Sequence, residues 1–289
     1  MKFSFYTGFS RTLAERGAAG CAAYARELGF SGIEGYPSAE LDSVEQAREV
    51  KKALDNEGLV TTCFSYASRL IGEKAQKSED YLKHLIDVAH EMGSPYLHHT
   101  LVPGLSTLHN GEPSFDQVLD EVVERAGRVA DYAAQAGMMC LYEDQGYYFN
   151  GSDRFDVLMK ALNRKNVGVC ADFGNILFDG ESPESFIGRN ANRIYNVHVK
   201  DYLWKSGNGP DPGPGWLRTR NGDYLRDTVP GHGCINMVSC LKLLLESGYD
   251  GYYAFEFGGP EPFDWGTKLA IHNIRYYMEL ARGSGKINI

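Results

Sequence analysis

The chain has 289 residues, of which 43% are hydrophobic and 23% are charged, with a formal net charge of −9. This composition is typical of a soluble globular protein with a large buried core. The acidic excess speaks against a nucleic-acid partner, because phosphate backbones are bound mainly by Lys and Arg. No apolar run reaches the roughly 18 to 20 residues that cross a bilayer, so we also expect no membrane partner.

The cysteines and the first residues bear on where the protein works. The six cysteines contain no C-x-x-C pair, and most of them lie in apolar runs. The opening stretch MKFSFYTGFSRT lacks the apolar core and the small-residue cleavage site of a signal peptide. We therefore expect reduced thiols in the core and a cytoplasmic location.

Short apolar runs alternate with longer amphipathic runs along the whole chain. The expected strands are 2–7, 32–36, 59–66, 96–101, 138–144, 167–173, 194–201 and 251–258. The expected helices are 13–28, 43–57, 78–92, 115–136, 152–163, 183–191, 235–247 and 264–282. Several helices end at a glycine, such as Gly29, Gly58, Gly93 and Gly137. This alternation implies parallel strands that are joined by helical crossovers.

Eight strand–helix units in 289 residues predict a closed (β/α)8 TIM barrel, an α/β fold, in a single domain over 1–289. An open doubly wound sheet is the alternative, but it usually has a Gly-rich phosphate turn after its first strand, and TGFSRT does not match one. A Gly/Pro-rich insertion loop at about 201–234 separates the seventh strand from its helix. Long loops of this kind are often lids or binding loops.

Each of the last four strands carries one ionisable side chain near its carboxyl end. Strand alternation places these four on the inner face of the barrel: Glu143, Asp172, His198 and Glu256. Their spacings of 29, 26 and 58 residues match one unit, one unit, and one unit plus the insertion. Three carboxylates at one barrel mouth repel each other unless a cation compensates them. The donor set favours Mn²⁺, with Co²⁺, Mg²⁺ and Zn²⁺ as alternatives.

The segments around these residues, LYEDQG, ADFGN, NVHVKD and AFEFGG, resemble the metal-binding set of the xylose-isomerase-like TIM barrels, the sugar phosphate isomerase/epimerase family. LGFSGIEGY (28–36) and VPGHGCINMVSCLKLLLESGYDGYYAFE (229–256) are similar to the same family. The resemblance implies a metal-dependent isomerase or epimerase of a keto-sugar or polyol. In such an enzyme Glu143 and Glu256 are ligands that also transfer a proton through an enediolate. Asp172 and His198 are ligands only.

Two positions depart from the ketose 3-epimerases of this family. Asn175 stands where they have a histidine, and Trp204 stands where they have an arginine. The stretch HVKD resembles instead the inositol-catabolism and keto-sugar branch. The first alternative is therefore a lyase or dehydratase that acts by β-elimination on a keto-sugar, a keto-inositol or a 3-keto-glycoside. A non-catalytic metal- or sugar-binding subunit and an apurinic endonuclease-like nuclease are further alternatives, and the net charge disfavours the nuclease.

Seven further residues are candidates for contact with a small carbohydrate substrate: Glu34, His98, Asn175, Lys200, Asp201, Trp204 and His232. Glu34 either binds substrate hydroxyls or supports a ligand, and Lys200 is either an oxyanion donor or the ion-pair partner of Asp201. His98 and His99 are adjacent, so only one of them faces inward, where it is a candidate acid or base for a β-elimination. The resemblance also implies a homo-oligomer, a dimer or a tetramer.

Overall fold

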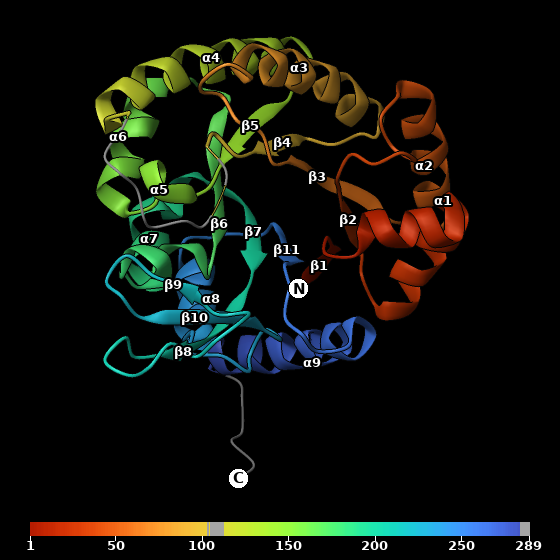
Figure 1. The fold of residues 1–289 in the computed structure, drawn as a ribbon. Helices are drawn as coiled ribbons and strands as arrows, with labels where there is room; N and C mark the ends of the chain where they lie inside the picture. Colours follow the sequence, from red (N-terminus) through yellow and green to blue (C-terminus); the bar gives the residue numbers. More distant parts are fainter. Residues whose placement is uncertain (103, 105–112, 284–289) are drawn as a thin grey trace.

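Eight parallel strands close into a barrel in the computed structural model, which describes residues 1–102, 104 and 113–283. The strand order is β1-β11-β7-β6-β5-β4-β3-β2 (Figure 1). The bounds are β1 Lys2–Phe5, β2 Gly32–Gly35, β3 Val60–Tyr66, β4 Tyr96–His99, β5 Met139–Tyr142, β6 Val167–Asp172, β7 Ile194–Val199 and β11 Tyr252–Phe255. The expected α/β barrel is confirmed, with each expected strand at its place.

Helices surround the barrel (Figure 1). They are α1 Phe9–Leu28, α2 Val44–Asn56, α3 Ala75–Glu91, α4 Phe115–Gln135, α5 Gly146–Phe149, α6 Ser152–Leu162, α7 Pro183–Asn190, α8 Met237–Glu246 and α9 Phe263–Ala281, with the short 3-10 helices η1 Asn175–Asp179 and η2 Ala191–Arg193. Ser43, Ser114, Ser182 and Asn236 accept a backbone N–H bond in the first turn of their helices, which sets where these helices begin.

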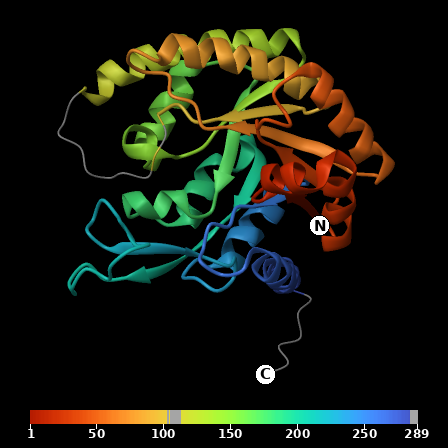
Figure 2. The ribbon, with the colours of Figure 1, turned by 45° about the vertical axis from the view of Figure 1, so that its right-hand side comes forward.

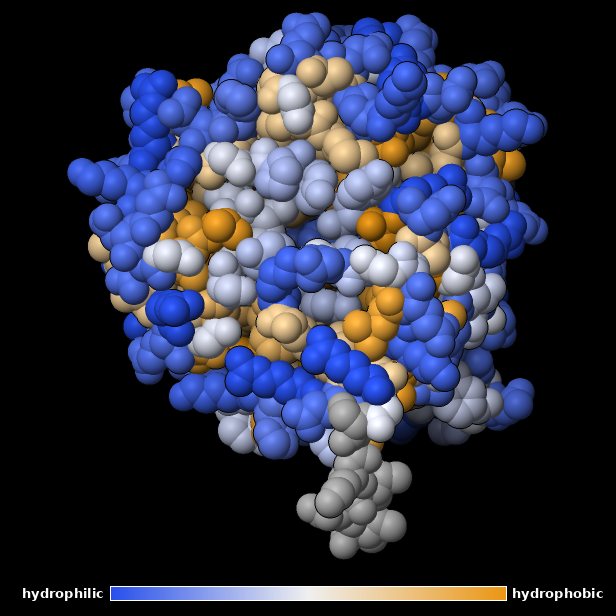
Figure 3. All heavy atoms as spheres, turned by 180° about the vertical axis from the view of Figure 1, so that it is seen from behind, coloured by the Kyte–Doolittle hydropathy of each residue, from blue (hydrophilic) through white to orange (hydrophobic). Residues whose placement is uncertain are grey.

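The face of the molecule that is seen from behind is largely hydrophilic (Figure 3). Seen from behind, blue residues cover most of the periphery, and less hydrophilic ones gather toward the middle (Figure 3). Within the described part of the chain, no helix is both long enough and apolar enough to span a membrane.

The barrel interior changes from apolar to polar toward the carboxyl ends of the strands. A small cluster of Cys63, Leu141 and Cys170 fills the middle of the barrel. In β7 the buried Val197 and Val199 belong to the large core between sheet and helices. The alternating His198 therefore points into the barrel. The polar side chains of NVHVKD that alternate with these valines therefore lie at the carboxyl-terminal mouth of the barrel.

The insertion after β7 is a three-stranded antiparallel sheet in the order β8-β10-β9, where the sequence suggested a loop (Figure 2). Its strands are β8 Asp201–Lys205, β9 Leu217–Arg218 and β10 Tyr224–Thr228. The strands DYLWK and YLRDT pair residue by residue from Asp201 with Thr228 to Lys205 with Tyr224. The glycines and prolines that suggested a loop are concentrated in the connection 207–215 and leave these strands free to pair.

Asp201 fixes the point where the insertion leaves and rejoins the barrel. Its Oδ2 accepts the backbone N–H groups of Gly231 at 2.9 Å and Gly233 at 2.8 Å. Its Oδ1 accepts those of Tyr202 at 2.9 Å and Ile235 at 3.2 Å. The expectation that Asp201 binds substrate is therefore wrong, because both oxygens of this fully buried carboxylate are engaged by the backbone.

Candidate metal centre

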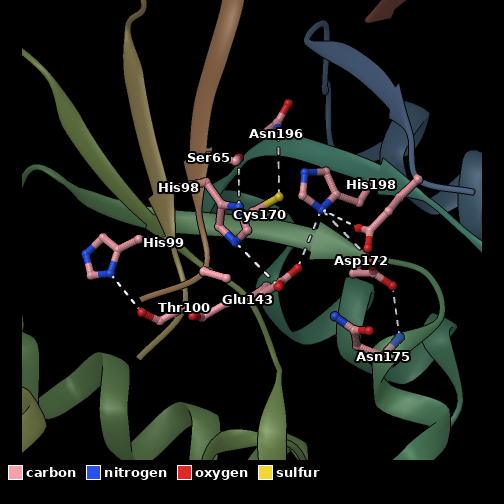
Figure 4. A network of polar contacts seen from close by, with 12 residues as sticks. Ser65, His98, His99, Thr100, Glu143, Cys170, Asp172, Asn175, Asn196 and His198 are labelled. Carbon is pink, nitrogen blue, oxygen red and sulfur yellow. Dashed lines mark hydrogen bonds and ion pairs between the residues drawn. The ribbon is translucent and has the colours of Figure 1, made fainter. Parts of the chain in front are cut away.

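Four side chains meet at the carboxyl ends of β5, β6, β7 and β11. Glu143 directly follows β5, Asp172 ends β6, His198 lies in β7 and Glu256 directly follows β11. One ligand atom from each lies within 4.8 Å of all the others. The sequence spacing predicted this cluster, and Figure 4 shows Glu143 and Asp172 turned toward His198.

The free atoms of these side chains face a common point. His198 Nδ1 lies 3.1 Å from Glu256 Oε2, 3.5 Å from Glu143 Oε2 and 4.0 Å from Asp172 Oδ2. The buried atoms Glu143 Oε2, Asp172 Oδ2 and His198 Nδ1 have no hydrogen-bond partner among the described residues. Buried polar atoms are normally satisfied, so the three orphans and the oxygen-rich donor set fit a divalent cation.

Glu34, from β2, supports His198 from behind. His198 Nε2 lies 2.8 Å from Glu34 Oε1, which also accepts the Ser65 hydroxyl. Asn196 donates to the other oxygen, Oε2, at 2.9 Å. Burial alone would raise the pKa of Glu34, but His198 and Ser65 hold that pKa below its usual value. Glu34 is therefore an anion that takes the Nε2–H of His198 and leaves Nδ1 free to bind a metal.

This placement corrects the expectation that Glu34 binds substrate. Glu34 is 0% exposed, and both of its oxygens already accept hydrogen bonds. The structure therefore supports the other role that the sequence left open, in which the side chain acts on His198.

Lys200 lies beside two of the metal-ligand candidates. Its Nζ is 2.5 Å from Glu256 Oε1 and 3.3 Å from Asp172 Oδ2. The expected alternative, an ion pair with Asp201, is therefore wrong. Burial alone would lower the pKa of Lys200, but Asp172 and Glu256 raise it well above its usual value. Lys200 is therefore a fixed cation at the edge of the cluster.

The carboxylates of the cluster differ in environment. Burial raises the pKa of Asp172 to about 6, although Lys200 acts to lower it. Two backbone N–H groups, those of Gly174 at 2.6 Å and Asn175 at 2.9 Å, hold its Oδ1. Burial would also raise the pKa of Glu256, but Lys200 and His198 bring it to about 2. The Glu256 side chain is 27% exposed, against 3% or less for the other three, so Glu256 is the metal-ligand candidate that solvent reaches most easily.

The structure separates the two adjacent histidines of β4 (Figure 4). His98 Nδ1 lies 3.0 Å from Ser65 Oγ, and its Nε2 lies 3.6 Å from Glu143 Oε1. Because the Ser65 hydroxyl hydrogen is donated to Glu34, His98 Nδ1–H must donate to Ser65. The Nε2 atom is then left to exchange a proton at the cluster. His99 faces away, stacks edge-on against Tyr142, and burial lowers its pKa to about 4.

The other candidate substrate residues occupy different places. Asn175 is fully buried beside Asp172, and neither atom of its side-chain amide has a partner within the described structure. Trp204 is 53% exposed on β8. His232 is exposed, and its ring centre lies 6.4 Å from that of Trp265 in α9. In the described structure, no hydrogen bond or ion pair joins Trp204 or His232 to the cluster, so their substrate contacts stay predictions.

Two residues at the site were missed from the sequence. Tyr6, just after β1, stacks on the His198 ring with ring centres 4.9 Å apart. The alternation of Ser4 and Tyr6 with the core residues Phe3 and Phe5 was the signal that could have found it. Asp227, in β10, lies beside Gly258, which is two residues after Glu256, and burial raises the pKa of its carboxyl to about 7. The spacing of the strand–helix units could not identify Asp227, because this residue lies in the insertion.

Curated relatives cover most of the chain at modest identity. Inosose dehydratase of Clostridium beijerinckii is 28% identical over 223 residues, 72% of this chain and 72% of the relative. Inosose dehydratase of Geobacillus thermodenitrificans is 25% identical over 221 residues, again 72% of each.

Solved structures share the fold at lower identity. A xylose isomerase-like TIM barrel protein of Mycobacterium smegmatis in complex with magnesium has a TM-score of 0.75 at 20% identity and covers 98% of this chain and 97% of its own. The 3-keto-D-glucoside 4-epimerase of E. coli has a TM-score of 0.73 at 17% identity and covers 95% and 99%. The family model described as the xylose isomerase-like TIM barrel matches residues 22–279. The family expected from the metal-ligand motifs is thereby confirmed: this chain belongs to the xylose isomerase-like TIM barrel family.

Proposed function

We propose that this chain is a divalent-metal-dependent dehydratase that removes water from a keto-polyol of the inosose class by β-elimination. The curated relatives named inosose dehydratase support this reaction and this substrate class. The observation that carries it is the free Nε2 of His98, which Ser65 holds 3.6 Å from Glu143 at the edge of the metal-ligand cluster. An elimination needs such a proton donor for the leaving hydroxyl, in addition to a base.

Glu143, Asp172, His198 and Glu256 would hold the metal ion, for which Mn²⁺ is our first choice. A bound divalent cation supplies positive charge at the substrate carbonyl, which makes the neighbouring C–H acidic enough for a carboxylate to remove its proton. Glu256 takes this proton, because it is the cluster carboxylate that is partly exposed. Lys200 holds Glu256 in place through its other oxygen, Oε1.

The second half of the reaction breaks the bond between carbon and the β-hydroxyl. The electron pair left by the removed proton forms the new carbon–carbon double bond. The hydroxyl leaves as water with a proton from Nε2 of His98, which enters this step as the doubly protonated imidazolium. Solvent then takes the proton from Glu256 and returns one to His98. His98 contacts Glu143 whereas Glu256 contacts Lys200, so acid and base flank the cluster on two different sides.

Isomerisation or epimerisation, the first expectation from the sequence, remains the second candidate. Glu143 and Glu256 both belong to the cluster, and a carboxylate on each side of a substrate would let a proton leave one face and return to the other. The structural likeness to a 3-keto-D-glucoside 4-epimerase is consistent with it and extends to the fold alone. The cytoplasmic location, the homo-oligomer and the single domain over the whole chain also stay predictions.

The test is turnover of inosose by the Mn²⁺-loaded protein in D₂O. We expect an unsaturated product that absorbs in the ultraviolet, and Glu256→Gln and Glu143→Gln should each lower its rate by at least about 1000-fold. Glu246→Gln, an exposed glutamate in α8 that pairs with Lys242, is the matched control. Deuterium incorporation without loss of water would favour the epimerase. If the protein catalyses neither reaction on any of a panel of keto-sugars and keto-inositols, both candidate functions are overturned.

A further inference from the structure

One face of the insertion sheet is turned toward the barrel. Tyr202 of β8 is 1% exposed and packs edge-on against Phe178 of η1, with ring centres 5.4 Å apart. Leu225 of β10 belongs to the same buried cluster. Asp227 is paired directly with Tyr202 and lies two residues after Leu225. Both relationships place its side chain on the same face of the sheet as Tyr202 and Leu225.

The Asp227 carboxyl lies beside the chain that follows β11, near the metal-ligand cluster. Burial raises its pKa to about 7, although Lys200 and the backbone N–H of Gly258 act to lower it. Gly258 is two residues after Glu256, and Asp227 Oδ2 lies 3.3 Å from where a Cβ on Gly258 would stand. Asp227 therefore lies beside the residues that follow β11, close in the chain to Glu256.

One oxygen of Asp227 is available to a ligand. Oδ1 is buried and has no hydrogen-bond partner in the described part of the chain. Leaving a buried acceptor unpaired lowers stability, so such an atom in a site is commonly paired by a ligand or a water. An ionised carboxylate oxygen can only accept a hydrogen bond, so the partner must be a donor. A hydroxyl group meets this requirement, and a phosphate or carboxylate does not.

We infer that Asp227 is a substrate-binding residue whose Oδ1 accepts a hydrogen bond from a hydroxyl of the keto-polyol, so that the insertion selects uncharged polyhydroxy substrates. This inference rests on the proposed function, because the substrate is the one whose carbonyl would lie at the metal-ligand cluster. It gives the insertion sheet a direct part in specificity, through one residue carried over the barrel mouth.

The test compares Asp227→Asn with Asp211→Asn, which makes the same change at an exposed aspartate of the insertion that caps the Gly213 N–H. We expect Asp227→Asn to raise the KM for inosose about 10- to 100-fold and to change kcat much less, since a charged hydrogen bond to the substrate is lost. Asp227→Ala should act in the same direction. Asp211→Asn should leave both constants unchanged. An unaltered KM in Asp227→Asn would overturn the inference.

Deoxy analogues of inosose separate a direct contact from a distorted site. For the analogue that lacks the bound hydroxyl, wild type and Asp227→Asn should have the same KM. A structural defect would instead raise the KM of the variant for all analogues alike. Calorimetric binding of myo-inositol, which lacks the carbonyl, separates this inference from the proposed reaction. If Asp227→Asn binds myo-inositol more weakly than wild type and neither protein dehydrates inosose, the inference holds and the proposed dehydratase reaction is wrong. If the protein dehydrates inosose with a KM that does not depend on Asp227, the proposed reaction holds and the inference is wrong.

Discussion

The Nε2 nitrogen of His198 lies 2.8 Å from Oε1 of Glu34, and both side chains are fully buried. Glu34 is in turn held by the Ser65 hydroxyl and the Asn196 amide. This arrangement sets the tautomer and the direction of the ring, so that Nδ1 faces the three carboxylates. A carboxylate behind a metal-binding histidine also makes the free nitrogen a stronger electron-pair donor to the metal.

We expect Glu34→Gln to weaken metal binding by about 10- to 100-fold, because the charge behind His198 is lost while the shape of the side chain is kept. Competition of the purified variant with a fluorescent chelator measures the change. Glu40→Gln, which alters an exposed glutamate near the same strand, is the control. If Glu34→Gln binds Mn²⁺ as tightly as wild type, Glu34 has no part in orienting the ligand.

Removal of metal should lower the thermal stability of the protein. An ion that binds only the folded chain stabilises it by about 2.7 kcal/mol at 100 times its dissociation constant, and a chelator removes that contribution. Differential scanning calorimetry should show a lower Tm with chelator and recovery on addition of Mn²⁺. Asp172→Ala should show little response to either treatment. Equal Tm values for wild type with and without the ion would argue against a metal at this cluster.

His98→Gln should separate the two halves of the proposed reaction. Loss of the proton donor should slow dehydration by about 100- to 10,000-fold. Exchange of the proton beside the carbonyl with D₂O should fall much less, because Glu256 performs that step. NMR of the substrate and absorbance of the product follow the two rates in one sample.

His90→Gln, at an exposed position in the last turn of α3, is the control for this experiment. An equal fall of exchange and dehydration in His98→Gln would indicate a damaged site. Unchanged dehydration would exclude His98 as the acid.

The ion-pair network between α3 and α4 should make stability depend on acid pH. Arg128 binds both oxygens of Glu79, at 2.8 and 2.7 Å, and Lys83 and Arg125 also contact it. The hydrogen bonds from Arg128 are the main reason that the pKa of Glu79 falls to about 2, from an ordinary value of 4.5. Because the folded-state pKa is the lower one, the network stabilises the protein above pH 4.5 and loses this contribution as the pH falls toward 2.

At pH 7 we expect Glu79→Gln to lower the free energy of unfolding by about 1–2 kcal/mol, less than the full shift implies because solvent screens the outer members of the network. Urea unfolding at several pH values should show the gap between wild type and variant closing as the pH drops below about 4.5. Glu124→Gln, at the exposed partner of Arg128, should change stability by less than about 0.5 kcal/mol. A gap independent of pH would contradict this assignment.

The barrel and the metal-ligand cluster could be predicted from the sequence because both follow local periods. Strand alternation decides which side chains face inward. The strand–helix unit has a nearly constant length, so Glu143, Asp172 and His198 stand at equivalent positions of successive strands. Contacts between elements are not periodic. The bond between Glu34 and His198 joins residues 164 positions apart, so its supporting role could not be separated from substrate contact by spacing. Asp227 was missed because Gly/Pro content hid the strands of the insertion.

Asp201 offers a way to exchange the insertion. Its carboxylate gathers the departing and the returning chain at one point through the backbone N–H groups of Tyr202, Gly231, Gly233 and Ile235. Gly233 has to be glycine for this approach, because a Cβ there would collide with the carboxylate. The returning chain is also tied to the barrel side, because Arg220 binds Asp179 and the backbone carbonyl of Tyr147. For protein engineering, the Gly/Pro-rich connection 208–215 is therefore the part of the insertion to exchange, while Lys200, one residue before the junction, keeps its position.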